Sequence, residues 1–142
     1  MLLGMALMVG AALAEEPAVQ EPAAPVVEVT LISRKTELQE FWSLPVSADG
    51  ALLSVELPTE REKWFWSVEL TMTVGAPPEA IPFQFQLSEV KRNRKGVERR
   101  RQVITEGEVV THNWGRANFE SVVEDHKGRV VEDFEMILRP RL

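Results

Sequence analysis

Residues 64–74 have the sequence WFWSVELTMTV, and their alternation of apolar and polar side chains decides the fold class. If the segment is extended, six apolar residues share one face: Trp64, Trp66, Val68, Leu70, Met72 and Val74. Successive side chains of a strand point to opposite faces, so the pattern predicts a strand with one buried and one wetter face. We expect Trp64 and Trp66 to lie in the core and Phe65 to point away from it.

The same period of two recurs on both sides of this segment. The next repeat is 81–87 (IPFQFQL), where Pro82 suggests a strand at the edge of its sheet. Residues 36–39 (TELQ) fit a helix capping box and a further strand equally well. Other strands are expected at 26–32, 51–57, 97–104, 108–114, 117–124 and 129–138.

Turn-forming residues separate these segments. They are Asp49-Gly50, the run from Gly75 to Pro78, Lys95-Gly96, and the run from Asp125 to Gly128. The last two predict hairpins. About eight short strands at spacings near ten residues, with hardly any helix, predict an all-β fold that consists of a single antiparallel β-sandwich. We expect Greek-key connections and an architecture that resembles the immunoglobulin-like domains of bacterial export proteins, as an analogy without a shared motif.

The N-terminal residues predict export. Residues 1–14 (MLLGMALMVGAALA) are uncharged and shorter than the roughly 20 residues that span a bilayer. Residues 12–14 match the small-x-small pattern of a cleavage site, so 1–14 is expected to be a signal peptide. Because no Lys or Arg precedes the apolar run, an uncleaved hydrophobic N-terminus is the alternative. Residues 15–25 (EEPAVQEPAAP) are expected to be an extended linker, and 26–142 the sandwich domain.

Length, charge and cysteine usage exclude several classes of protein. The chain has 142 residues, which fits one domain, and no Cys, which excludes disulfides, thiol nucleophiles and thiolate metal sites. Its 16 Lys and Arg against 22 Asp and Glu give a net charge of −6, which disfavours a dedicated nucleic-acid binder. With the signal peptide, we expect a periplasmic or secreted protein that does not span the membrane after cleavage.

Residues that would support catalysis are scarce, so we expect a non-enzymatic protein without a cofactor. No G-x-S-x-G motif and no Gly-rich phosphate loop occurs. His112, His126 and Asp125 are the one candidate metal cluster, but the histidine spacing does not require a site, and we expect none. Most glutamates, such as Glu69 and Glu132, alternate with apolar residues, as on the solvated face of a strand.

The unusual surface feature is the basic segment 91–101 (KRNRKGVERRR). It holds seven of the sixteen basic residues and a single acid, so it carries +6 and the rest of the chain −12. If 81–90 pairs with 97–104, these charges gather on a hairpin tip, at an edge or overhang where Arg on both faces stays hydrated. The candidate partner-binding residues are Lys91, Arg92, Arg94, Lys95, Arg99, Arg100 and Arg101.

Two interpretations of the basic segment remain open. Charged edge strands prevent edge-to-edge aggregation, and a local positive field attracts anionic partners. Candidate partners are an acidic protein surface, an anionic envelope component such as lipid head groups or lipopolysaccharide, and a second copy of the chain. The acidic surface of that copy would comprise Glu120, Glu124, Asp125, Glu132, Asp133 and Glu135.

The sequence therefore favours a binding or assembly module, such as an accessory subunit of an envelope complex. A sandwich that binds carbohydrate or another small ligand is the alternative, suggested by the aromatic run Trp64-Phe65-Trp66. A metal-dependent enzyme ranks third.

Overall fold

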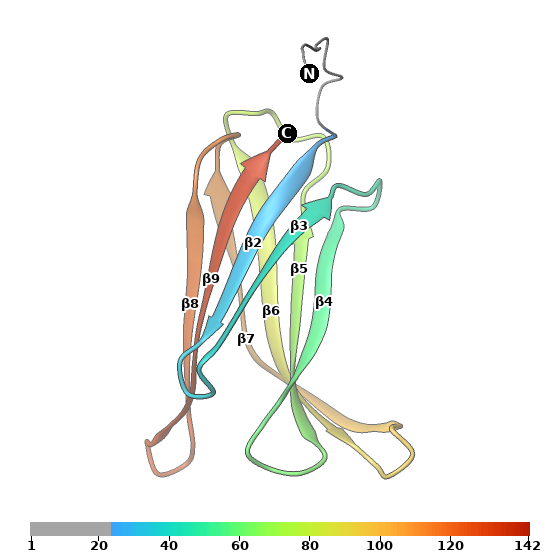
Figure 1. Cartoon of the computed structure of the whole chain (residues 1–142), viewed down its shortest axis with the longest axis vertical. Helices are drawn as coiled ribbons and strands as arrows, with labels where there is room; N and C mark the ends of the chain where they lie inside the picture. Colours follow the sequence, from blue (N-terminus) through green and yellow to red (C-terminus); the bar gives the residue numbers. More distant parts are fainter. Residues whose placement is uncertain (1–23) are drawn as a thin grey trace, which may run out of the picture.

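The computed structural model describes residues 24–142, which form two packed antiparallel sheets (Figure 1). One sheet has the order β3–β2–β9–β8 and the other β4–β5–β6–β7. The strands are β2 (Val26–Ser33), β3 (Leu38–Pro45), β4 (Ala51–Pro58), β5 (Trp64–Met72), β6 (Ile81–Arg92), β7 (Glu98–Thr111), β8 (Ala117–Glu124) and β9 (Val130–Arg141). The all-β sandwich is thus confirmed. The expected signal peptide, and the expected linker up to residue 23, lie outside the described residues.

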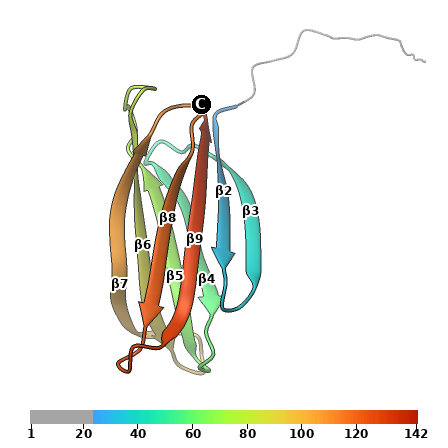
Figure 2. The same ribbon diagram turned by 90° about the vertical axis from the view of Figure 1, so that its left-hand side faces the viewer.

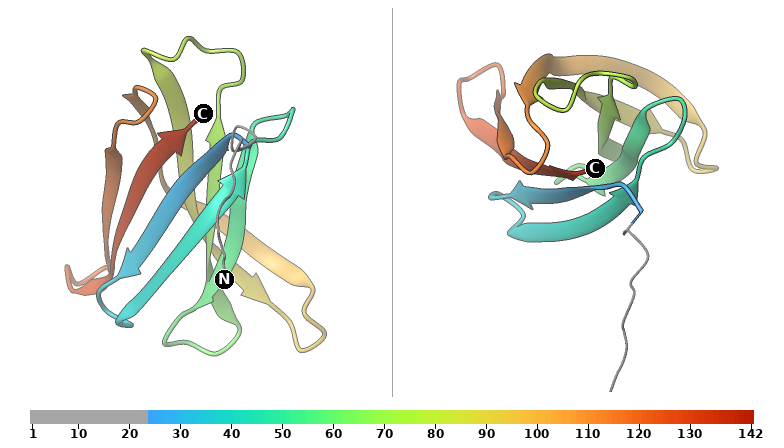
Figure 3. Two further views of the ribbon diagram at one scale, coloured as in Figure 1. Left: turned by 45° about the horizontal axis from the view of Figure 1, so that its top comes forward. Right: turned by 90° about the horizontal axis from the view of Figure 1, so that it is seen from above.

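Each sheet buries one face against the other, as the view from above in Figure 3 shows. In β2, Val27, Val29 and Leu31 are fully buried, and the residues between them are partly exposed. Burying side chains of this size contributes about 1.5–3 kcal/mol each. Trp66 of β5 packs edge-on against Phe134 of β9, with ring centroids 6.0 Å apart, and so links the two sheets.

The connectivity differs from the expected Greek key. Most consecutive strands pair with each other in one sheet. The two exceptions, β3 with β4 and β7 with β8, lie side by side at the edges of the sandwich, where the chain passes from one sheet to the other (Figure 2). β9 returns to pair with β2, with Val26 opposite Arg141. A Greek key needs one long connection that carries a strand past its neighbours. Among the described residues the longest connection, 73–80, has eight residues, so the order is up-and-down.

Residues 36–39 belong to a turn and a strand. Thr36 and Glu37 complete the turn after β2, with Glu37 at φ +56°, and β3 begins at Leu38. β3 pairs with β2 along its whole length. Because the backbone groups of β3 that face β2 are satisfied in this ladder, the segment is extended and the capping-box pattern produces no helix here.

Segments 97–104 and 108–114 were expected as separate strands, but β7 runs unbroken from Glu98 to Thr111. Gly107 lies opposite Phe85 on the buried side of the sheet. The ring of Phe119, from β8, stacks on Phe85 with centroids 4.9 Å apart and comes close to Gly107. The ring thus packs next to Gly107, and the ladder with β6 continues through this residue.

Pro82 was expected to mark an edge strand, and that expectation is wrong, because β6 lies between β5 and β7. The Pro82 carbonyl accepts a hydrogen bond from Thr73, just beyond the last residue of β5. The N and C=O groups of a strand residue point to the same side, so the missing donor of Pro82 faces the end of β5. The missing donor therefore lies where the β5–β6 ladder ends, not in its middle.

The two ends of the described chain lie at one end of the sandwich, and the β6–β7 turn lies at the other (Figure 1). Residues 24–142 contain no helix of the length and apolarity needed to cross a membrane.

Candidate functional site

The β6–β7 hairpin carries the basic segment and projects away from the sandwich, as Figures 1 and 3 both show. The turn is held by Asn93, whose Oδ1 accepts hydrogen bonds from the amides of Lys95 (2.9 Å) and Val97 (3.0 Å). Gly96 adopts φ +80°, a conformation that a residue without Cβ takes readily. β7 is an edge strand, so both the expected hairpin and its position at an edge are observed.

Arg92 attaches the hairpin to β4. Its Nε donates to Glu56 Oε1 at 3.0 Å, its Nη2 contacts Glu56 Oε2, and its Nη1 donates to the Gly96 carbonyl at 3.0 Å. The hydrogen bonds from Arg92 lower the pKa of the Glu56 carboxyl. A two-pronged pair of this kind fixes geometry as well as charge. The Arg92 charge is therefore used inside the fold.

Arg101 is engaged in the same way on the outer face of the sheet. It donates to Glu98 from Nε (3.2 Å) and Nη2 (3.0 Å), and to Ser67 Oγ from Nη1 (3.3 Å). The hydrogen bonds from Arg101 lower the pKa of Glu98. In the β6–β7 ladder Arg101 is opposite Val90, which is fully buried. Arg101 thus serves the stability of the hairpin.

Five of the seven candidate residues are exposed and form no ion pair with any described residue, and one of these, Lys91, lies against the Trp64 ring instead. We call the other four the free cations: Arg94, Lys95, Arg99 and Arg100. Arg94 and Lys95 are in the turn, and Arg99 is the extra residue of a bulge, since Lys91 is opposite Arg100 and Arg92 is opposite Glu98. This bulge breaks the strict alternation expected for Arg99.

Trp64 is a residue that sequence reasoning placed wrongly. It is only half-buried and is absent from the core that contains Trp66. The Arg61 guanidinium lies 4.1 Å from its ring centroid and the Lys91 ammonium 5.7 Å from it. Trp64 thus supports two cations at the base of the hairpin. The pattern gave no sign of this, because Trp64 has the same parity as the core residues but lies at the strand end.

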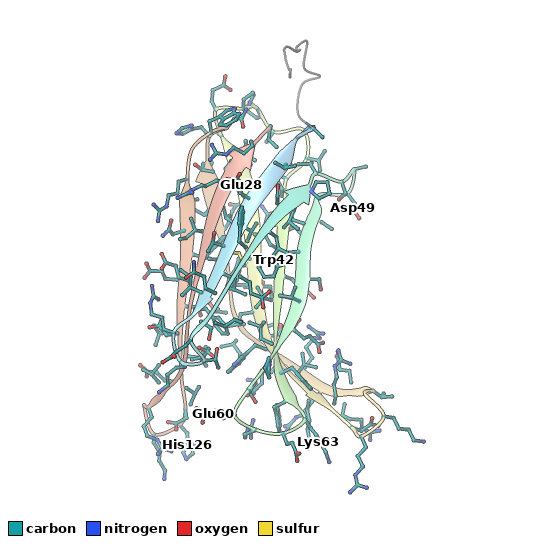
Figure 4. All side chains as sticks on the ribbon, viewed as in Figure 1. Glu28, Trp42, Asp49, Glu60, Lys63 and His126 are labelled. Atoms are coloured by element: carbon teal, nitrogen blue, oxygen red, sulfur yellow. The ribbon has the colours of Figure 1, made fainter. Side chains whose placement is uncertain are left out.

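The loop 59–63 borders the hairpin, because the amide of Arg92 donates to the Lys63 carbonyl at 2.9 Å. Figure 4 shows Glu60 and Lys63 in this loop at the lower end of the molecule. The loop carries both signs of charge, so it adds no net positive charge to the hairpin.

The expected acidic surface of a second copy is largely used within the fold. Asp133 and Glu135 pair with Arg34 at 3.2 and 2.6 Å, and Asp125 pairs with Arg129 at 3.0 Å. Hydrogen bonds from the Arg129 and Lys127 amides and from the Arg129 side chain lower the pKa of Asp125. Only Glu120 and Glu124 of that set remain exposed without an ion pair among the described residues.

Glu132 was expected on a solvated face but is buried, with 2% of its surface exposed. Its Oε1 accepts hydrogen bonds from Ser33 Oγ at 2.7 Å and from the Asp133 amide at 3.0 Å. The parity of β9 places Glu132 on the same side as Phe134 and Met136, which explains its burial. A buried carboxyl needs such donors because water is excluded.

The histidine candidates are far from each other. His112 lies in the connection after β7, not in a strand as expected, and its Nδ1 is 3.0 Å from the Asn113 carbonyl oxygen. His126 lies in the β8–β9 turn at the opposite end of β8 (Figure 4). In the part of the chain that the structure describes, no three His, Asp or Glu side chains are grouped to hold a metal ion.

Two other surface features are less developed than the hairpin. A shallow hollow of about 440 Å³ lies on the outer face of β5–β7, among Glu69, Gln84 and Glu108. At the opposite end of the molecule from the hairpin, Trp114 is 64% exposed at φ +66°, with the Arg141 guanidinium 4.7 Å from its ring centroid. The hollow is open, and its central Gln84 already donates to Glu108 at 2.9 Å, whereas ligand sites are usually enclosed and mostly apolar.

In comparison with known proteins, the chain matches no family model, no curated protein and no solved structure.

Proposed function

We propose that this protein is a non-enzymatic binding or assembly module that docks onto an acidic protein surface through its β6–β7 hairpin. The observation that supports this is the placement of the four free cations on a projecting hairpin, in a chain whose net charge is −6. Internal ion pairs hold the base of the hairpin. Because the hairpin is already ordered, binding a partner through the free cations costs little further conformational entropy.

The proposal includes export and a place in the bacterial envelope as an accessory subunit of a complex. It is supported by the apolar run 1–14 and the small-x-small pattern at its end, residues 12–14. The hairpin lies at the end of the sandwich away from Val26, where the N-terminal segment joins the domain.

An acidic protein is favoured over lipid head groups by the kind of cation. Arg outnumbers Lys eleven to five in the chain, and Arg94, Arg99 and Arg100 are three of the four free cations. The planar guanidinium matches a carboxylate with two parallel hydrogen bonds. Phosphate head groups share that chemistry, so lipid binding is an outcome that the test must distinguish.

The test compares a hairpin variant with a charge-matched control in crosslinking experiments on intact cells. The variant changes all four free cations to Ser and keeps Arg92 and Arg101, which hold the hairpin. The control removes four exposed basic residues outside the hairpin that form no ion pair with described residues: Lys35, Arg116, Lys127 and Arg139. Both proteins have the same net charge, so any difference between them reports the position of the charge.

We expect the wild type and the control to crosslink to a discrete protein, and the hairpin variant to lose the product by about tenfold or more, as four lost charge pairs predict. High salt should remove the product as well. Equal yields from all three proteins would refute docking through the hairpin. Binding to phosphatidylglycerol vesicles with no protein crosslink would instead assign the hairpin to lipid.

A further inference from the structure

The outer edge of β7 carries an unpaired row of backbone groups next to the free cations. β7 hydrogen-bonds to β6 on one side and to no described strand on the other. β8 lies beside the upper part of β7, near Gly107, but the hairpin diverges from β8 toward its tip (Figure 1). All six residues from Glu98 to Val103 are exposed. An edge of this kind is a template for another strand.

Two bulges define which part of the edge is regular. Arg99 and Ile104 have no opposite residue on β6, whereas the four residues between them pair in unbroken register. These pairs are Arg100 with Lys91, Arg101 with Val90, Gln102 with Glu89, and Val103 with Ser88. In a regular antiparallel strand alternate residues turn their N–H and C=O groups away from the partner. The segment Arg100–Val103 therefore offers a short edge for pairing, which we call the β7 edge.

The positive charges beside the β7 edge determine which kind of strand can pair with it. A second copy that added its own β7 edge would bring Arg99, Arg100 and Arg101 close to the same residues, and like charges on opposite strands are destabilising. Lys91, across the ladder from Arg100, adds to this repulsion. An acidic strand instead gains opposite-charge pairs together with backbone hydrogen bonds.

We propose that the partner of the hairpin is an extended acidic segment of another protein, which adds as a strand to the β7 edge. This inference rests on the proposed docking function and specifies its geometry. The backbone hydrogen bonds would supply affinity, and the free cations would select a segment with Asp or Glu at alternate positions. The same Arg side chains that prevent two β7 edges from pairing would then favour the correct partner.

The experiment uses a short peptide of alternating Glu and Val and an analogue in which every peptide nitrogen is methylated. The analogue keeps the charges but has no backbone donor. We expect the parent peptide to bind and the analogue to bind about tenfold more weakly or worse. This is the loss expected for the two hydrogen bonds that peptide amides would donate to the outward-facing carbonyls of the β7 edge. Binding of the parent peptide should slow amide hydrogen exchange within Arg100–Val103.

The outcomes separate this inference from the proposed function. Equal binding of both peptides to the wild type, lost in the hairpin variant, would keep electrostatic docking and overturn strand addition. Slowed exchange at β3, β4 or β8 instead of the β7 edge would also overturn it. If neither peptide binds, strand addition is refuted, and the crosslinking comparison alone decides whether the hairpin docks a folded acidic surface.

Discussion

Gly50 and Gly75 adopt nearly the same backbone conformation, with φ of +80° and +83°, but have different surroundings. A Cβ on Gly50 would overlap the Met72 carbonyl oxygen, whereas a Cβ on Gly75 would meet nothing within 4 Å. The Gly50 carbonyl also accepts a hydrogen bond from the Met72 amide at 2.8 Å, so the two segments cannot separate freely. Gly75→Ala should therefore lower the free energy of unfolding by about 1–2 kcal/mol, through backbone strain alone.

Gly50→Ala should cost about 3 kcal/mol or more, because overlap is added to the same strain. Urea denaturation of both variants measures the difference, and Gly75→Ala serves as the matched control. If both variants lost the same free energy of unfolding, the β3–β4 turn would have to move away from Met72 without a loss of stability. The sequence identified Asp49-Gly50 as a turn, but not this close approach, because Met72 is distant along the chain.

Acid should loosen the β6–β7 hairpin before it unfolds the sandwich. The pKa values of Glu56 and Glu98 are both lowered, by hydrogen bonds from Arg92 and Arg101 respectively. A carboxyl whose pKa is lowered by folding stabilises the folded state above its unfolded pKa, and this contribution is lost as pH falls through the folded pKa. Both ion pairs hold the base of the hairpin, so their loss acts there first.

Amide hydrogen exchange is measured from about pH 7 to about pH 3 and corrected for intrinsic rates. As the pH is lowered, the amides of residues 92–101 should lose protection at a higher pH than those of β2 or β9. Glu56→Gln should weaken that protection at neutral pH and reduce its further decrease in acid. A hairpin as protected at low pH as at neutral pH would mean that the Arg92 and Arg101 pairs do not hold it.

Alternation predicted most strands because one face of each is buried, and its failures have specific causes. The pattern in 36–45 is weak because most residues of β3 are exposed, so a local capping box competed with the strand. The pattern was divided at 105–107 because this part of β7 lacks alternating apolar side chains, whereas pairing with β6 continues through Gly107. Trp64 has the parity of core residues but lies at the end of its strand, where parity does not ensure burial. Glu132 also has core parity and is buried, although its carboxyl group suggested a solvated face. The cluster of basic residues was visible in the sequence, but which of its members form ion pairs was not.

Strand order was the part of the fold that the sequence left undetermined. Turn residues such as Asp49-Gly50 and Lys95-Gly96 show where the chain reverses, but not which strands become neighbours across the sandwich. The order depends on contacts between distant segments, such as Val26 with Arg141 and Trp66 with Phe134. The projection of the hairpin follows from the same arrangement, since the end of β7 extends beyond the part that lies beside β8.

The positive hairpin and the negative remainder of the molecule should have opposite effects on how salt changes the rate of peptide association. The direction of the salt effect therefore shows whether local or net charge governs the encounter. The net charge of −6 repels an acidic peptide, so if net charge governed the encounter, added salt would speed association. The free cations attract the peptide, so if the hairpin governs it, added salt slows association. At ~0.1 M salt the Debye length is only about 10 Å, and a peptide near the projecting tip senses mainly the tip.

We therefore expect the association rate constant of the Glu–Val peptide to fall as salt rises from ~0.1 M to ~0.5 M, measured by stopped-flow fluorescence with a labelled peptide. The charge-matched control should keep this dependence, because its substitutions lie outside the hairpin. The hairpin variant should associate more slowly and should lose or reverse the dependence, since only the acidic body remains. A rate that rises with salt in the wild type would mean that the acidic body outweighs the tip, and that the hairpin does not guide its partner.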